Sequence, residues 1–132
     1  MSKTDELNKD GFQKCLVIGG AGMLGYEIVT QLLREGKFVR VLDLVAVHDD
    51  RIESIVGDIR NEDDVRNACN GIDIVFQTAA AVWDPKIPAS LYEEVNVEGN
   101  RIVINTCKRL AIPRLVYTST MDVVFDGRKP II

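Results

Sequence analysis

Residues 15–25 read CLVIGGAGMLG, a short apolar run that passes into a turn rich in glycine. The apolar run stops at Gly19, and Gly22 and Gly25 follow just as an amphipathic stretch begins. Strand, glycine-rich turn and helix start in this order are typical of the phosphate-binding corner of a dinucleotide-binding βαβ unit. Gly19 would allow the sharp turn, Gly22 the approach of a diphosphate, and Gly25 close packing of helix on strand. Free amides and the positive dipole end of the helix would then face the anion.

In dinucleotide-binding units, an acidic residue a set distance after the glycine turn binds a ribose, and this chain has one at that distance. Asp43 ends a second apolar run, and the matching acidic residue of such units stands about 20 residues after the glycines. A carboxylate there accepts hydrogen bonds from ribose hydroxyls and repels the additional phosphate of NADP. No Lys or Arg stands between Asp43 and Arg51, so we expect the cofactor to be NAD. The alternative is that Asp43 merely ends a strand.

Strand-like and helix-like patterns alternate along the rest of the chain, which is typical of a parallel α/β sheet. The patterns predict five strands, at 14–19, 38–43, 52–57, 73–77 and 114–120. They also predict three helices, from Leu24 to the stop at Gly36, from the cap Asn61 to Asn70-Gly71, and from Ala89 to Leu110. Because crossovers are right-handed, we expect a Rossmann-type doubly wound parallel sheet of order 3-2-1-4-5 that is truncated after its fifth strand. Residues 1–13 would be a disordered lead-in, and 14–132 an NAD-binding Rossmann domain incomplete at its C-terminus.

Composition narrows the classes of protein further. The chain has 132 residues and a net charge of −4 without a cluster of Lys and Arg, which disfavours nucleic acid as a partner. No apolar run approaches the roughly 20 residues that span a bilayer. Cys15, Cys69 and Cys107 lack metal-like or Cys-x-x-Cys spacing, so we expect reduced cysteines, no metal and a cytoplasmic protein. His48 is the only histidine, which argues against a nucleophile activated by histidine.

Five short motifs occur in the order found in one family of enzymes. They are Gly19-x-x-Gly22-x-x-Gly25, Gly57-Asp58-Ile59-Arg60, Thr78-Ala79-Ala80-Ala81, Asn96-Val97-x-Gly99 and Leu115-Val116-Tyr117-Thr118-Ser119-Thr120. From Lys14 to Gly127 the chain resembles extended short-chain dehydrogenases/reductases. Within that family it is similar to the 3β-hydroxysteroid dehydrogenase branch and its relatives, the NAD-dependent sugar epimerases and dehydratases.

The resemblance implies roles for residues around a bound NAD. Met23 and Leu24 would present backbone amides to the diphosphate. Asp58 and Ile59 would hold the adenine ring, with the carboxylate accepting from its amino group. The small side chains of Ala79, Ala80 and Ala81 would let the backbone approach the nicotinamide side. The alternatives are that Asp58 only caps a turn and that the alanines form an ordinary loop.

The resemblance also implies a catalytic residue, Thr120, which would hydrogen-bond the reacting hydroxyl or carbonyl of the substrate. The alternative is that Thr120 is an ordinary threonine at the end of a strand. Two positions depart from the family pattern, since Gln77 stands where relatives often have His and Asn100 where they have Thr. The family's Tyr-x-x-x-Lys pair has no counterpart in this sequence, because Tyr26, Tyr92 and Tyr117 are followed four residues later by Thr30, Asn96 and Met121.

These observations predict the NAD-binding half of an oxidoreductase that acts on the CH–OH group of a secondary alcohol or on the matching ketone. A 3β-hydroxysteroid or sterol is the leading small-molecule substrate. The resemblance implies an NAD-dependent dehydrogenase, and without the Tyr/Lys pair we expect this chain alone to be inactive. The alternatives are an NAD-dependent nucleotide-sugar epimerase or dehydratase and a non-catalytic NAD-binding regulatory module. An open sheet edge at Val116 and Tyr117 would favour homo-oligomers and weaken both stability and NAD binding.

Overall fold

The computed structural model describes residues 13–81 and 84–119. The predicted lead-in, apart from Gln13, therefore lies outside the described residues. The five strands are β1 (Lys14–Ile18), β2 (Phe38–Asp43), β3 (Ile52–Val56), β4 (Ile74–Gln77) and β5 (Arg114–Tyr117). The helices are α2 (Met23–Arg34), α3 (Glu62–Cys69), α4 (Ala89–Glu93), a π-helical segment η2 (Glu94–Gly99) and α5 (Asn100–Arg109).

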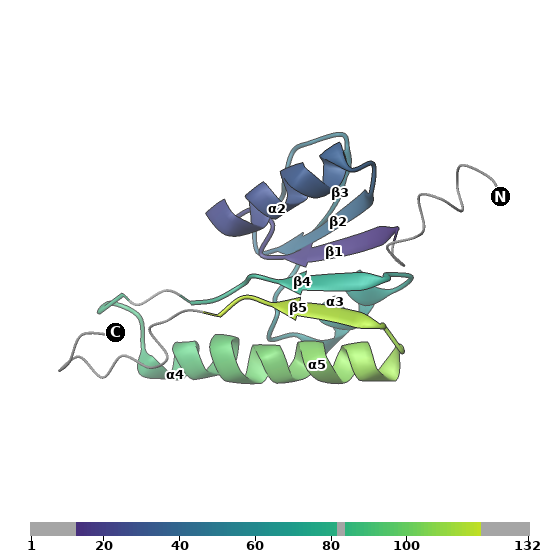
Figure 1. Ribbon diagram of the computed structural model, residues 1–132. Helices are drawn as coiled ribbons and strands as arrows, with labels where there is room; N and C mark the ends of the chain where they lie inside the picture. The colour runs from purple at the N-terminus through teal and green to yellow at the C-terminus, as the bar shows by residue number, and fades with distance from the viewer. Residues whose placement is uncertain (1–12, 82–83, 120–132) are drawn as a thin grey trace, which may run out of the picture.

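All strand pairs are parallel, and the sheet order is β3-β2-β1-β4-β5, which confirms the predicted Rossmann-type topology. Helix α2 covers one face of the sheet, while α3 and the long helical stretch that ends in α5 cover the other (Figure 1). Several predicted strands are one to three residues longer than those observed. The connection between β2 and β3 carries no helix, as predicted.

Strand β1 sits at the centre of the sheet and supplies side chains to both cores. Cys15 and Val17 pack toward α2, and Leu16 and Ile18 pack toward α3 and α5. All four are almost completely buried, as expected for a central parallel strand covered on both faces. Complete burial of a Val, Leu or Ile side chain stabilises a fold by about 1.5–3 kcal/mol, so β1 contributes to the stability of both cores.

At the amino end of the sheet, one carboxylate joins the beginnings of β1 and β4. Asp73, just before β4, accepts hydrogen bonds through Oδ2 from the amides of Gln13 and Lys14, both at 2.9 Å. These bonds lower the pKa of the Asp73 carboxyl below its ordinary value. They join the beginnings of two neighbouring strands at the end of the sheet that is farthest from the glycine turn.

The helix predicted for residues 89–110 is helical along its length but is not one regular α-helix. Its middle part, η2, is a π-helical segment, a feature that often occurs at functional sites. Gly99 ends this segment, and a Cβ atom there would lie 3.0 Å from Cγ2 of Ile59. Gly99 therefore serves close packing, against the loop that follows β3.

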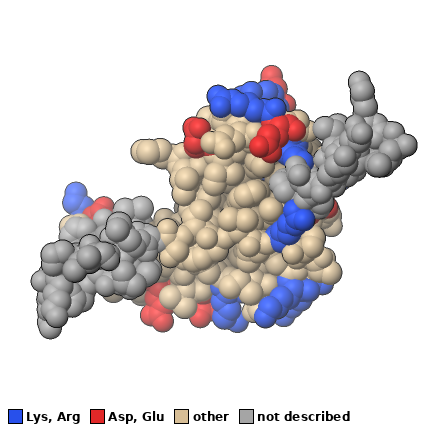
Figure 2. All heavy atoms as spheres, viewed as in Figure 1, with Lys and Arg blue, Asp and Glu red and all other residues tan. Residues whose placement is uncertain are grey.

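Strand β5 forms an edge of the sheet within the described part of the chain. Val116 and Tyr117 on this strand are exposed. In the view of Figure 2, the charged side chains gather over α2 and along α5, while the region over β4 and β5 between them carries few. Within residues 13–81 and 84–119, no helix combines the length and apolar character that a membrane crossing requires.

Candidate cofactor-binding site

The glycine turn after β1 is tightly closed by backbone contacts. Gly19 has a φ of 84°, a conformation that favours glycine, and its amide donates to the carbonyl of Leu42 at 2.8 Å. The amide of Gly22 donates back to the carbonyl of Gly19 at 3.0 Å. A Cβ atom on Gly25 would lie 2.2 Å from that same carbonyl oxygen, which leaves no space for a side chain. The predicted roles of Gly19 and Gly25 in the turn thus have a direct steric basis.

Helix α2 starts from this turn without any cap from a side chain. Its N-cap residue is Gly22, and no acidic residue stands in its first turn. Within the described residues, the amides of Met23 and Leu24 have no hydrogen-bond acceptor. The side chain of Met23 is 94% exposed. The positive end of the helix dipole is therefore open to a ligand that carries negative charge.

A cleft of about 570 Å³ opens at the carboxyl ends of the strands, beside the glycine turn. Eight of the predicted cofactor residues line it, namely Gly19, Gly22, Asp43, Asp58, Ile59, Ala79, Ala80 and Ala81. Met23, Leu24 and Gly25 are not among the lining residues, although they lie in the turn of α2 that follows Gly22 directly. Thr120, the predicted catalytic residue, lies outside the described residues.

Asp43 connects the end of β2 to the glycine turn. Its Oδ2 atom accepts a hydrogen bond from the amide of Ala21 at 3.1 Å, and Oδ1 accepts from the amide of Val45 at 3.3 Å. The carboxylate therefore lies beside the cleft and next to the start of α2. The two residues after Asp43, Leu44 and Val45, also line the cleft, and both are uncharged.

On the same side of the cleft, the carboxylate of Asp58 is held by Arg60. The guanidinium of Arg60 donates to Asp58 at distances down to 2.7 Å and to Glu94 on η2 at 3.1 Å. The hydrogen bonds from Arg60 hold the pKa of Asp58 below its ordinary value, so this carboxyl is ionised at neutral pH. Arg60 thus ties the loop after β3 to the helical segment across from it, a role that the sequence analysis did not assign.

The far side of the cleft is the loop after β4. Thr78 fixes this loop to β1, since its amide and its hydroxyl both donate to the carbonyl of Ile18, at 2.9 and 2.7 Å. Three apolar residues, Ile87, Leu91 and Val95, complete the wall from the stretch that leads into α4 and η2. None of the three was predicted as a cleft residue. Leu91 and Val95 are four residues apart in the helical stretch, which is the signal for one helix face, whereas Ile87 precedes the N-cap Pro88 and carries no such signal.

The described part of the chain holds no group of three or more His, Cys, Asp or Glu side chains suited to a metal ion. Cys15, Cys69 and Cys107 are buried and free, and none lines the cleft. The chemistry that this site can support is therefore binding of an anion at the start of α2, with polar groups at Asp43 and Asp58 on one side. A parallel sheet of this order, with a glycine turn at its switch point, is the arrangement of Rossmann-type dinucleotide-binding domains.

Comparison with known proteins defines the family within this class. Residues 16–132 match the 3-beta hydroxysteroid dehydrogenase/isomerase family, and the chain belongs to it. It is 36% identical over 127 residues to mouse (Mus musculus) sterol-4-alpha-carboxylate 3-dehydrogenase, decarboxylating, covering 94% of this chain and 34% of that protein. It is 37% identical over 126 residues to 3-beta-hydroxysteroid dehydrogenase of Mycolicibacterium neoaurum, covering 87% of this chain and 34% of that protein. The chain thus spans about a third of the length of these relatives.

Solved structures show the same fold with a nucleotide in place. A short-chain dehydrogenase/reductase superfamily protein from Agrobacterium tumefaciens with bound NAD matches 84% of this chain and 34% of its own, with a TM-score of 0.77 and 28% identity. UDP-glucose 4-epimerase from Thermus thermophilus in complex with NAD matches 82% of this chain and 38% of its own, with a TM-score of 0.72 and 30% identity. Both of these structural relatives therefore bind NAD.

Proposed function

We propose that this chain is the NAD-binding part of an oxidoreductase that acts on the CH–OH group of a secondary alcohol or on the matching ketone. Membership of the 3-beta hydroxysteroid dehydrogenase/isomerase family supports the reaction class. The observation that carries the proposal is the uncapped start of α2, whose free amides adjoin a cleft that also holds Asp43. A diphosphate fits this place because it brings the negative charge and the acceptor atoms that the open amides lack.

The glycine turn leaves space for a diphosphate. A Cβ atom on Gly22 would meet only the carbonyl oxygen of Gly19, at 3.3 Å, so the surface above this residue is bare backbone. Asp43 would accept hydrogen bonds from the adenosine ribose, and Asp58 with Ile59 would hold the adenine ring. The absence of a positive charge among Asp43, Leu44 and Val45 favours NAD over NADP.

In the reaction we propose, the residues of this chain bind and orient the reactants. A bound cofactor would supply the hydride acceptor for the alcohol in its oxidised form, NAD⁺, or the hydride donor for the ketone in its reduced form, NADH. The backbone of Ala79, Ala80 and Ala81 would form the wall on the nicotinamide side. Thr120 would orient the reacting oxygen of the substrate by a hydrogen bond. Because this sequence holds no Tyr-x-x-x-Lys pair to serve as general acid and base, we expect no turnover from this chain alone.

Calorimetric titration of the chain with NAD and with NADP tests the cofactor proposal. We expect NAD to bind and NADP to bind about tenfold more weakly, because the Asp43 carboxylate repels the extra phosphate. Replacing Asp43 by Asn should narrow that difference. A chain that binds neither nucleotide, or that prefers NADP, would contradict the proposal.

A 3β-hydroxysteroid or sterol is the substrate class we propose, because two relatives that the chain matches at 36% and 37% identity bear sterol and 3β-hydroxysteroid names. The second candidate is a nucleotide-sugar epimerase or dehydratase, which the 30% identity to a UDP-glucose 4-epimerase favours. Titrating the NAD-saturated chain with a 3β-hydroxysterol and with UDP-glucose separates them. Binding of UDP-glucose alone would overturn the sterol proposal, and steady reduction of NAD by either compound would overturn the expectation of inactivity.

Association of the chain with itself is a further part of this proposal. The exposed side chains of Val116 and Tyr117 lie on strand β5, which pairs on one side only in the described structure. An open edge with apolar side chains favours pairing with another chain. Sedimentation over a range of concentrations tests this expectation, which a monomer at every concentration would contradict.

A further inference from the structure

Below the loop that follows β4, hydrogen bonds with Ala79 and Asn100 hold the side chain of Gln77 in one orientation. Gln77 ends β4 and is only 1% exposed. Its Oε1 atom accepts from the amide of Ala79 at 2.9 Å, and its Nε2 atom donates to the carbonyl of Ala79 at 2.9 Å. The two atoms of the Gln77 amide are therefore not interchangeable, since one must accept and the other must donate.

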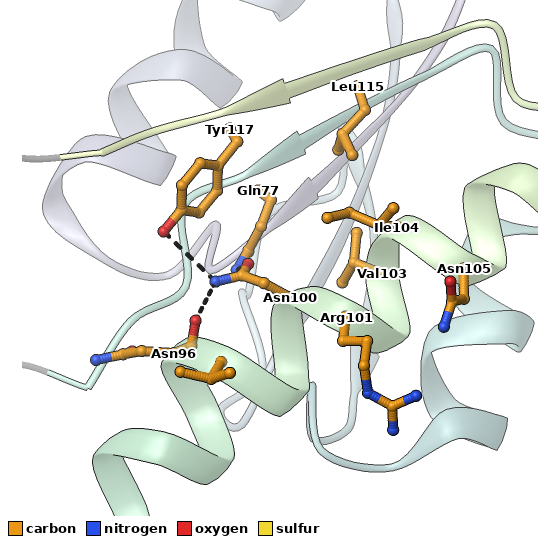
Figure 3. A pocket seen from close by; sticks show the side chains of 10 residues that line it. Gln77, Asn96, Asn100, Arg101, Val103, Ile104, Asn105, Leu115 and Tyr117 are labelled. Atoms are coloured by element: carbon orange, nitrogen blue, oxygen red, sulfur yellow. Dashed lines mark hydrogen bonds between the residues drawn. The ribbon is translucent and has the colours of Figure 1, made fainter.

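The second hydrogen on Nε2 of Gln77 continues the network to the long helical stretch. It is donated to Oδ1 of Asn100 at 2.7 Å, at the start of α5. Nδ2 of Asn100 then donates to the carbonyl of Asn96 at 2.6 Å and to the hydroxyl of Tyr117 at 3.5 Å. Figure 3 shows Gln77, Asn100 and Tyr117 pointing toward one another between the sheet and the helix.

Asn96, in the π-helical segment, holds the other end of the same loop. Its Oδ1 atom accepts from the amide of Ala81 at 2.9 Å, and Nδ2 donates to the carbonyl of Ala81 at 3.2 Å. Side-chain amides thus bind both polar groups of Ala79 and both polar groups of Ala81. Ala80 lies between them and lines the cleft with its two neighbours.

The loop that these amides hold lies on one particular side of the cleft. Asp43 and Asp58 follow β2 and β3, on one side of the central strand β1, and the loop follows β4 on the other side. A dinucleotide lies across the switch point of such a sheet, with one nucleoside over each half. Since the ribose-binding carboxylate belongs to the β2 side, the nicotinamide half falls on the β4 side.

We propose that Gln77 and Asn100 are positioning residues that hold the backbone of Ala79–Ala81 in place against the nicotinamide half of NAD. The inference deepens the proposed function and rests on it. Both residues also line a second cavity of about 430 Å³ beside α5 and β5. Each hydrogen that the two amides donate has one acceptor, so removing either amide loosens the Ala79 end of the loop, while Asn96 still holds Ala81.

The experiment compares two ligands that share the adenosine diphosphate part. Wild-type chain, Gln77→Met and Asn100→Asp are titrated with NAD and with ADP. Met fills a similar volume to Gln without hydrogen bonds, and Asp at 100 still accepts from Gln77 but has no hydrogen for Asn96 or Tyr117. The matched control is Asp73→Ala, which removes two hydrogen bonds to backbone amides at the opposite end of β4.

We expect Gln77→Met to weaken NAD about tenfold or more and ADP by less than about twofold, because only the nicotinamide half meets the loop. Asn100→Asp should act in the same direction, and it decides the question if Gln77→Met does not fold. Asp73→Ala should leave the ratio of the two affinities unchanged. Equal losses for NAD and ADP in the Gln77 or Asn100 variant, or no loss for NAD, would overturn the positioning role.

Hydrogen exchange at the amides of Ala79 and Ala81 gives a readout that needs no nucleotide. The amide of Ala79 should exchange faster in Gln77→Met and Asn100→Asp than in the wild type, and not in Asp73→Ala, while the amide of Ala81, which Asn96 holds, should change less. Unchanged exchange would overturn the inference. If the wild-type chain bound neither NAD nor ADP, the proposed function would fail, while the exchange rates would still decide whether the two amides hold the loop.

Discussion

The beginnings of α2 and α3 are two solutions to the same problem, because the first amides of any helix lack partners within it. At α3, Asn61 accepts from the amide of Asp64 at 3.1 Å, and Glu62, Asp63 and Asp64 place negative charge in the first turn. At α2, the N-cap is Gly22, and the first turn holds neither a capping side chain nor an acidic residue.

We propose that the difference separates a helix end used for structure from one left for a ligand. Oδ2 of Asp64, in the first turn of α3, accepts from the amide of Asp58 at 3.0 Å, so this helix start holds the loop that bounds the cleft. The start of α2 adjoins the same cleft, but the amides of Met23 and Leu24 have no acceptor within the described residues. In one small domain, the capped end builds the wall of the site and the uncapped end is free to bind an anion.

We expect the largest loss of stability and of NAD binding from a side chain at Gly25, where the glycine turn leaves no space for one. In Gly25→Ala, the new Cβ would lie 2.2 Å from the carbonyl oxygen of Gly19 and 2.8 Å from Oγ1 of Thr78. We expect the turn to shift, the free energy of unfolding to fall by about 3 kcal/mol, and NAD binding to be lost. Urea unfolding and calorimetry measure both. The control is Gly22→Ala, whose Cβ meets a single atom at 3.3 Å and which should still fold.

A capping side chain at the start of α2, like the one at the start of α3, should weaken NAD binding without lowering the free energy of unfolding. Gly22 has a φ of −76° and a ψ of 170°, an extended conformation that Asp adopts readily as an N-cap. In Gly22→Asp we expect NAD to bind at least about tenfold more weakly, because the carboxylate occupies the free amides and repels the diphosphate. The free energy of unfolding should stay the same or rise by about 1 kcal/mol. Unchanged NAD affinity in this variant would show that α2 does not hold the anion.

The reverse change at α3 should affect stability alone. Asn61→Ala removes the cap of α3, and we expect the free energy of unfolding to fall by about 1 kcal/mol. NAD affinity of the folded protein should change by less than about twofold, since the amides of α2 are untouched. Thermal unfolding with and without NAD measures the two effects together. A large loss of NAD affinity would contradict the division between the two helix ends.

The smallest effect concerns acid pH at the loop that α3 supports. Because Arg60 lowers the pKa of Asp58 in the folded protein, the Asp58–Arg60 pair stabilises the fold above the ordinary carboxyl pKa of 3.8. That contribution is lost as pH falls below 3.8 and through the lowered value. Melting temperatures of the wild type and Asp58→Asn should therefore differ slightly at neutral pH and converge in acid. A difference that grows in acid would contradict this assignment.

Local signals made much of this fold predictable from the sequence. The glycine turn, the cap at Asn61 and the alternation of strands and helices each depend on residues close together in the chain, and the strand order followed from the handedness of crossovers. Seven of the predicted cleft residues lie in the family motifs, and Asp43 was found from its distance to the glycine turn. Their roles toward NAD stay predictions, as does that of Thr120, which lies outside the described residues.

Contacts between distant residues could not be predicted in the same way. The sequence marks Gln77 and Asn100 as two separate departures from a family pattern, and only the fold brings their side chains to 2.7 Å. Arg60 could pair with any nearby carboxylate, and its choice of Asp58 and Glu94 depends on where η2 lies. The π-helical segment itself has no periodic signal, because it changes the hydrogen-bond pattern without changing which residues are apolar.

The burial of Cys15 provides the protein with an internal reporter of unfolding. Its thiol lies in the central strand with no exposed surface, and burial raises its pKa to about 11. A thiol must be both ionised and accessible before an alkylating reagent can modify it. The rate at which Cys15 is alkylated therefore follows the opening of β1, and slower alkylation in the presence of a nucleotide would register binding without any label on the ligand.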